Sequence, residues 1–137
     1  PIEVFDDIRK GTATNRSQFF KDLTIPFYGF NRPGVKINDG LRESFWLMGM
    51  EGGIKSEYDC IREFSEVDYT ADLKKIDKPT LVIHGDDDQI VPIAASGKKT
   101  ASIVKGAQLK LYKGGSHGLA QIDPETFNAD LLAFVRS

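Results

Sequence analysis

Two short loops of the sequence carry the side chains that could do chemistry. The first loop places three aspartates, Asp86, Asp87 and Asp88, after the apolar run 80–83 and the dipeptide His84-Gly85 that ends it. The second places His117 in a glycine-rich stretch that follows the run 109–112. An aspartate bonded to a histidine orients the imidazole as a general base, and such a pair is two thirds of a nucleophile–histidine–acid triad. The loops therefore predict one acid and one base.

The two runs that precede these loops are predicted to be strands of one sheet. The run 80–83 shows no alternation of polar and apolar residues, which indicates a strand buried on both faces, whereas the alternation at 109–112 indicates a strand with one wet face. A helix is predicted between them, from Pro92 to about Val104. This order favours a parallel pair, and open α/β sheets hold their chemistry at the carboxyl ends of such strands.

The first half of the chain is predicted to be helical. Apolar spacing predicts a helix over 1–23 that is weakened between Gly11 and Asn15, and proline and glycine predict a loop over 25–34. A second helix is expected to start at a cap on Asn38 or Asp39 and to carry the apolar stripe Leu41, Phe45 and Met48. A third is expected after the break Gly52-Gly53, with the apolar stripe Ile54, Tyr58, Ile61 and Phe64. A short helical turn is expected after a cap on Thr70.

The end of the chain is predicted to be one more helix. Asp123 and Pro124 supply a cap and a first-turn proline, and Phe127, Leu131 and Phe134 form an apolar stripe that should be buried. Two strands make a poor sheet, and the first is patterned for neighbours that the helical half cannot supply. We therefore expect the chain to be the C-terminal part of a larger α/β unit.

Several other residues have two interpretations that the sequence leaves open. The aromatic residues at 27, 28 and 30 either pack on the protein body or line a pocket. The run 45–48 is apolar on every side, so it is expected to be covered, for example in a homo-oligomer. Cys60 is the only cysteine, which excludes an internal disulfide, and it is interpreted as a small core residue rather than a nucleophile.

Composition excludes several classes of function. The 137 residues carry a net charge of -2 with no basic run, which argues against nucleic-acid binding. No apolar run approaches the roughly 20 residues of a membrane span, and no signal peptide is visible. With a single cysteine, these features favour a cytoplasmic protein.

Longer stretches of the sequence resemble a known family. DLKKI at 72–76, KPTLVIHGDDDQIVP at 78–92, GSHG at 115–118 and NADLLAF at 128–134 look like α/β-hydrolases, most closely the bacterial arylesterases also called cofactor-free haloperoxidases or perhydrolases. The loop 26–31 is similar to their cap region. The resemblance runs along the whole chain but covers only the later half of such a protein. It implies a helical cap segment over 1–68, and over 69–137 the final two parallel strands with their flanking helices.

The resemblance assigns the triad acid to Asp88, the fourth position of G-x-x-D, and the base to His117. The alternatives for Asp88 are a turn-forming role, shared with Asp86 and Asp87, or a metal site, although adjacent aspartates face one ion poorly. His84 is interpreted as structural, with its ring nitrogens bonded to nearby backbone.

The nucleophile is the missing member. A G-x-S-x-G pattern does occur at 114–118, but Ser116 is rejected because no helix starts directly after it, and because the fold's chain order is serine, acid, histidine. The resemblance therefore implies that the serine and the oxyanion hole lie in an N-terminal half of the hydrolase, outside this chain. Alone, this chain is expected to be inactive.

The implied activity of the intact protein is hydrolysis of small carboxylic esters through an acyl-enzyme, with perhydrolysis as a second activity and no metal or organic cofactor. Ile8, Leu23, Phe27 and Ile90 are candidates for an apolar substrate pocket, with ordinary core packing as the alternative. Other chemistry on the same fold, such as dehalogenation or lyase reactions, and a non-catalytic interaction module also stay open.

Overall fold

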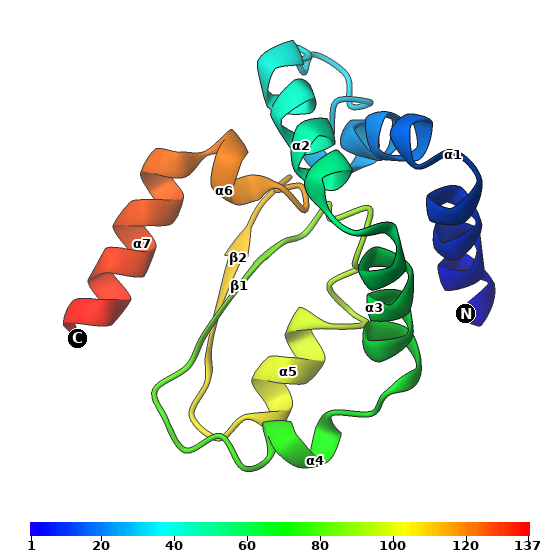
Figure 1. Cartoon of the computed structure of the whole chain (residues 1–137). Coiled ribbons are helices and arrows are strands. Elements are labelled where there is room, and N and C mark those ends of the chain that lie inside the picture. The colour runs from blue at the N-terminus through cyan, green and yellow to red at the C-terminus, as the bar shows by residue number, and fades with distance from the viewer. The chain divides into compact units, whose positions relative to one another are not determined.

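The computed structural model describes residues 1–137 and contains seven helices and two strands (Figure 1). In chain order these elements are α1 (Ile2–Tyr28), α2 (Asp39–Glu51), α3 (Ile54–Glu66), α4 (Thr70–Leu73), β1 (Leu81–Gly85), α5 (Gly97–Ile103), β2 (Gln108–Tyr112), α6 (Leu119–Ile122) and α7 (Pro124–Arg136). The chain forms two compact units, Pro1–Ile25 with Lys36–Asp68, and Pro26–Val35 with Tyr69–Ser137. The sequence predicts a single boundary, after residue 68. The two divisions differ in the segment 26–35, which the structure groups with the second unit.

Helix α1 of the first unit is broken in the middle, as its sequence predicts. Asn15 has φ −150° and ψ 73°, outside the helical region. Its side-chain oxygen accepts a hydrogen bond from the Gln18 N–H at 3.1 Å, so Asn15 caps the second half of α1.

The predicted loop over 25–34 is wrong at its start, because α1 continues through Pro26 to Tyr28. Proline removes one intrahelical hydrogen bond, which is least disruptive close to a helix end. The helix stops at Gly29, whose φ of 70° is the left-handed conformation that glycine adopts without strain.

Helices α2 and α3 begin where their cap signals predict. The Asn38 side chain accepts from the Leu41 N–H at 3.0 Å, and α3 starts directly after Gly53. Of the predicted stripe on α3 only Ile61 is buried, whereas Ile54, Tyr58 and Phe64 are exposed.

Two smaller expectations in this half are corrected. Cys60 is exposed rather than packed in the core, because it lies on a face of α3 that no other element of the chain covers. The residue preceding α4 is Tyr69, so Thr70 is the first helical residue and not the cap.

The second unit is built on β1 and β2, which pair in parallel with Leu81 opposite Gln108 and Gly85 opposite Tyr112. Figure 1 shows α5 and α7 on opposite sides of the strand pair. Only Gly85 of β1 is buried, so the predicted burial on both faces is wrong for this chain, in which β1 has a strand neighbour on one side only.

The helix between the strands starts later than predicted. Residues 93–96 form turns, with the Ala95 N–H bonded to the Pro92 carbonyl at 2.8 Å, and α5 begins only at Gly97. Ser96, with φ −135° and ψ −85°, is not helical, which separates the turn from the helix.

Helix α7 is capped as predicted, because the Asp123 side chain accepts from the Thr126 N–H at 3.2 Å. Its predicted buried stripe is wrong, since α7 has no buried residue and Leu131 is 40% exposed. The helix is tied to β2 by the Tyr112 hydroxyl, which donates to Asp130 at 2.5 Å. Burial, and then this contact, raise the pKa of Tyr112 to about 12. No helix of the chain is both long and apolar enough to cross a membrane.

Candidate active site

The Asp88 carboxylate lies at the centre of the loop that follows β1. Its side chain is 4% exposed. Oδ1 accepts the backbone N–H groups of Ile90 at 2.9 Å and of Val91 at 2.8 Å, while Oδ2 lies 2.8 Å from His117 Nδ1. Backbone donors on one oxygen fix the plane of the carboxylate, so the other oxygen is held in position for the imidazole.

His117 lies in the loop between β2 and α6 and is more accessible, with 32% of its side chain exposed. Because Nδ1 faces a carboxylate, Nδ1 carries the proton, and this N–H donates a hydrogen bond to Asp88. No side chain or backbone group of this chain bonds Nε2. The imidazole therefore presents a free nitrogen lone pair, which is the state a general base needs.

Close backbone packing brings the two loops together. A Cβ atom on Gly85, at the end of β1, would lie 2.0 Å from the Gly115 carbonyl oxygen, so this contact requires glycine. The Asp86 N–H bonds the Tyr112 carbonyl at 3.0 Å, and the Asp86 carboxylate accepts the Gly114 N–H at 2.6 Å. The parallel strands therefore end side by side, and the loops that follow them are bonded to each other.

A second histidine contacts the same carboxylate. His84 Nε2 lies 2.9 Å from the Val91 carbonyl and 3.2 Å from Asp88 Oδ2. Both partners are acceptors, so Nε2 carries the proton and has no free lone pair. The side chain is 13% exposed, and a Cβ on Gly97 would lie 2.7 Å from its Nδ1. The backbone bond and close packing agree with the predicted structural role.

The loop that follows β1 and carries the three aspartates is here called the acid loop. Its aspartates point to three different partners, which argues against a shared metal site. Asp86 bonds the Gly114 N–H, Asp87 pairs with Arg32, and Asp88 faces His117. No cluster of three or more histidine, cysteine, aspartate or glutamate side chains in the chain could hold a metal ion.

Sequence reasoning missed the contacts that the segment 26–35 makes with the acid loop. Arg32 forms a two-pronged ion pair with Asp87, in which Nε and Nη2 each lie 2.5 Å from a carboxylate oxygen. The hydrogen bonds from Arg32 hold the pKa of Asp87 below its usual range. Next to it, the amides of Asn31 and Gln89 donate to each other at 2.9 and 3.0 Å. Nothing in the local sequence signals pairs more than fifty positions apart.

Ser116 is buried in the same loop as His117, directly before it, and does not resemble an activated nucleophile. The residue is 5% exposed, and its hydroxyl oxygen has no hydrogen-bond partner. Gly118, two positions on, bonds the Phe27 carbonyl through its N–H at 2.9 Å, and α6 is only a single turn. The serine thus lacks both a bonded base and the long following helix of a nucleophile elbow.

The four predicted pocket residues are divided between the two units. The Phe27 ring packs edge-on against the His117 ring with centroids 4.7 Å apart, and Ile90 contacts Asp88 through its N–H. Ile8 and Leu23 are half-buried on α1 in the first unit. A substrate role for any of the four stays a prediction.

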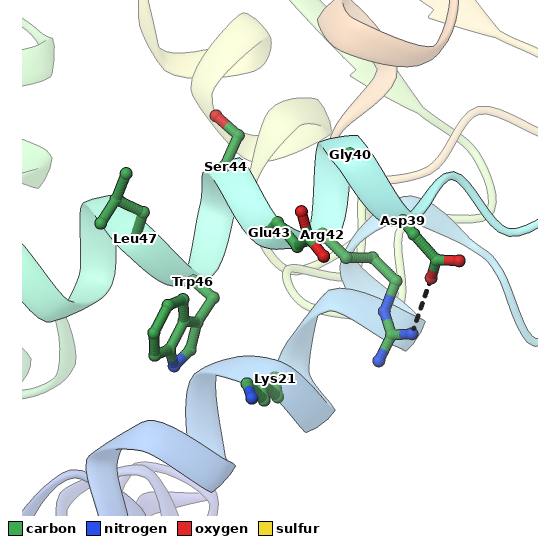
Figure 2. A pocket seen from close by; sticks show the side chains of 8 residues that line it. All are labelled: Lys21, Asp39, Gly40, Arg42, Glu43, Ser44, Trp46 and Leu47. Carbon is green, nitrogen blue, oxygen red and sulfur yellow. Dashed lines mark hydrogen bonds and ion pairs between the residues drawn. The ribbon is translucent and has the colours of Figure 1, made fainter.

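The first unit has a groove of its own between α1 and α2. Its volume is about 720 Å³, and Figure 2 shows the side chains that line it. Lys21 Nζ lies 4.9 Å from the centre of the Trp46 ring, whose indole N–H donates to Ser17 at 3.1 Å. The groove combines cations, anions and one aromatic ring, but no nucleophile bonded to a base.

Comparisons with known proteins place the chain in a family. A family model described as "Serine aminopeptidase, S33" matches residues 60–125. A non-heme haloperoxidase of Rhodococcus erythropolis is 53% identical, over 100% of this chain and 50% of that protein. A bifunctional esterase/perhydrolase of Acinetobacter calcoaceticus is 51% identical with the same coverage. The crystal structure of a bromoperoxidase from Bacillus anthracis matches with a TM-score of 0.91 and 32% identity, over 97% of this chain and 48% of that one.

The chain thus spans about half the length of the curated relatives it matches. The predicted fold class is confirmed by the solved structure, since nearly the whole chain superposes on part of it. These matches show that the chain belongs to the α/β-hydrolase superfamily, in which it corresponds to the C-terminal half of the non-heme haloperoxidases and of the related esterase/perhydrolase.

Proposed function

We propose that the chain supplies the acid and the base of a serine-hydrolase triad, with Asp88 as the acid and His117 as the base. One observation carries this proposal: Asp88 Oδ2 lies 2.8 Å from His117 Nδ1, and the other carboxylate oxygen is held by two backbone N–H groups. In this arrangement the carboxylate fixes the tautomer of the imidazole and stabilises the imidazolium that forms during turnover.

The chemistry is acyl transfer to a serine. His117 Nε2 takes the serine proton as the serine oxygen attacks the ester carbonyl, and then gives that proton to the departing alcohol. Water attacks the acyl-enzyme in the second step and loses a proton to Nε2, which passes this proton to the serine oxygen as the carboxylic acid leaves. When hydrogen peroxide attacks instead of water, the product is a peracid, which is the perhydrolase reaction.

The nucleophile and the oxyanion hole belong, in this proposal, to an N-terminal segment of the hydrolase that acts as the partner of this chain. The coverage of about half of each relative supports this, as do the buried, unbonded hydroxyl of Ser116 and the strand β1 with a neighbour on one side only.

Small carboxylic esters are the proposed substrates. Two similar proteins, a haloperoxidase and a bifunctional esterase/perhydrolase, support ester hydrolysis with perhydrolysis as a second activity. Phe27 against the His117 ring and Ile90 beside Asp88 would give the acyl group apolar contacts. Ile8 and Leu23 stay candidates on the sequence pattern alone.

The test compares two neighbouring aspartates in the hydrolase assembled with its serine-bearing half. Asp88→Asn is expected to lower kcat for p-nitrophenyl acetate by about 10⁴-fold, because the amide favours the wrong imidazole tautomer. Asp86→Asn is the matched control, since an asparagine oxygen still accepts the Gly114 N–H, and it is expected to change kcat little. Full turnover in Asp88→Asn would exclude the proposed acid.

Labelling with a fluorophosphonate, which reacts with activated serines, tests where the nucleophile lies. We expect the label on the N-terminal segment and none on this chain. Assays with acetate and hydrogen peroxide then show whether the same triad makes peracid, and a preparation that hydrolyses esters without forming peracid would remove the second activity.

A further inference from the structure

The segment Phe27–Arg32, here called the strap, contacts His117 and the two residues that flank Asp88. It connects the end of α1 with the coil before α2 and belongs to the same compact unit as the strands. On the base side, the Phe27 ring lies 4.7 Å from the His117 ring, and the Phe27 carbonyl accepts the Gly118 N–H at 2.9 Å.

On the acid side, the strap holds the two residues that flank Asp88. Asp87 is held by Arg32 through two hydrogen bonds of 2.5 Å, and Gln89 is held by Asn31 through a pair of amide hydrogen bonds. A two-pronged guanidinium–carboxylate pair fixes orientation as well as distance. With its neighbours fixed on both sides, Asp88 can turn little relative to His117.

The Arg32–Asp87 pair is expected to contribute little to the free energy of unfolding. A change in activity after its removal can therefore be distinguished from a loss of folding. The two side chains are 42% and 36% exposed, and exposed ion pairs generally add little to the free energy of unfolding. An exposed pair with this geometry is better suited to fixing the direction of a loop.

We propose that Arg32 is a positioning residue for the Asp88–His117 pair, acting through Asp87 and the strap. This inference rests on the proposed function, because it assumes that the pair does acid–base catalysis. Arg32 itself bonds Asp87 and forms no hydrogen bond or ion pair with Asp88 or His117.

The kinetic test uses Arg32→Ala in the hydrolase assembled with its serine-bearing half. Removing the guanidinium is expected to lower kcat by about 10- to 100-fold, the scale of a displacement of about 1 Å in an active site, while KM changes less. Lys75→Ala is the matched control, since it removes another exposed ion pair of the same unit, with Asp72, far along the chain from the strap. The thermal midpoint of both variants should stay close to that of the parent.

Two further measurements separate positioning from a merely structural role. Free guanidinium, at concentrations that do not denature the protein, is expected to restore much of the kcat of Arg32→Ala and none of that of His117→Ala. The double variant Arg32→Ala/Asp87→Ala should lose no more than the more affected single variant, because the two residues act as one unit.

The proton NMR signal of the His117 Nδ1–H reports the pair without any turnover, and its loss in His117→Ala assigns it. We expect this signal to shift or broaden in Arg32→Ala and to stay in place in Lys75→Ala. A kcat within twofold of the parent would overturn the proposal, and so would a lower kcat with an unchanged signal. If His117→Ala keeps full turnover, the proposed function itself fails, and the NMR comparison still shows whether the strap holds the pair.

Discussion

Two histidines contact the Asp88 carboxylate, and their surroundings differ in a way that decides which can do chemistry. His84 lies at the end of β1, where its one donor is bonded and its ring packs against Gly97. His117 lies in the loop after β2, with Nδ1 bonded, Nε2 unbonded and more than twice the exposed fraction. A shared carboxylate is therefore not enough to make a base; an unbonded and accessible nitrogen is also needed.

The largest effect on activity is expected at His117, the more exposed of the two histidines. His117→Ala is expected to lower kcat/KM of the assembled hydrolase by about 10⁴-fold or more, because it removes the group that takes the serine proton in the proposed mechanism. The unfolding midpoint should change little, since the ring is partly exposed. Ester hydrolysis and thermal unfolding measured on one preparation check both statements, and His84→Ala should show the reverse, a lower midpoint with a much smaller loss of turnover per folded molecule.

The next largest effect is expected at Gly85, where the end of β1 packs against the loop that follows β2. Gly85→Ala would place a methyl group 2.0 Å from the Gly115 carbonyl oxygen, and a backbone atom cannot move aside as a side chain can. We expect a loss of about 3 kcal/mol in the free energy of unfolding, with reduced activity as the loops separate. Urea denaturation of the assembled protein measures this loss. A stability equal to the parent's would show that the contact between Gly85 and Gly115 has room for a methyl group.

A smaller effect tests the packing around His84 alone. Gly97→Ala would bring a methyl group to 2.7 Å from His84 Nδ1, and the ring must tilt to admit it. The expected cost is about 1–2 kcal/mol, with kcat close to the parent value. Gly40→Ala is the control, because its nearest neighbour would lie at an ordinary 3.6 Å and alanine favours helices, so the stability should hold or rise.

The smallest effect is expected at Ser116. Its hydroxyl is buried without a partner, so Ser116→Ala removes a desolvated polar group and is expected to leave stability unchanged or raise it by up to about 1 kcal/mol. Turnover and fluorophosphonate labelling should stay at the parent level. A loss of labelling in this variant would mean that the G-x-S-x-G pattern at 114–118 holds the nucleophile after all.

The sequence was sufficient for features set by neighbouring residues. The cap at Asn38, the break at Asn15 and the parallel strand pair are local or nearly local in origin, and all three are present. The approach of Asp88 to His117 was also predictable, because each follows a strand and parallel strands end together. Their catalytic roles stay predictions.

Features that depend on distant partners could not be predicted. The pairing of Arg32 with Asp87 joins residues 55 positions apart, and no local pattern indicates it. Burial was also misjudged: β1, Cys60 and Leu131 are less covered than their patterns suggest, because a hydrophobic pattern records that a residue needs cover and not which element supplies it.

The short separation along the chain between the acid and the base has a kinetic consequence. Asp88 and His117 are 29 positions apart and are joined by one strand–helix–strand unit, whereas the strap contacts the acid loop from 55 to 58 positions away. Closing a shorter loop costs less chain entropy, so contacts within one such unit form earlier during folding than those that span longer segments. We therefore expect the pair to come together first in an imprecise arrangement, and the strap to arrive late, so that the final geometry of the pair is set in one of the last folding steps of this unit.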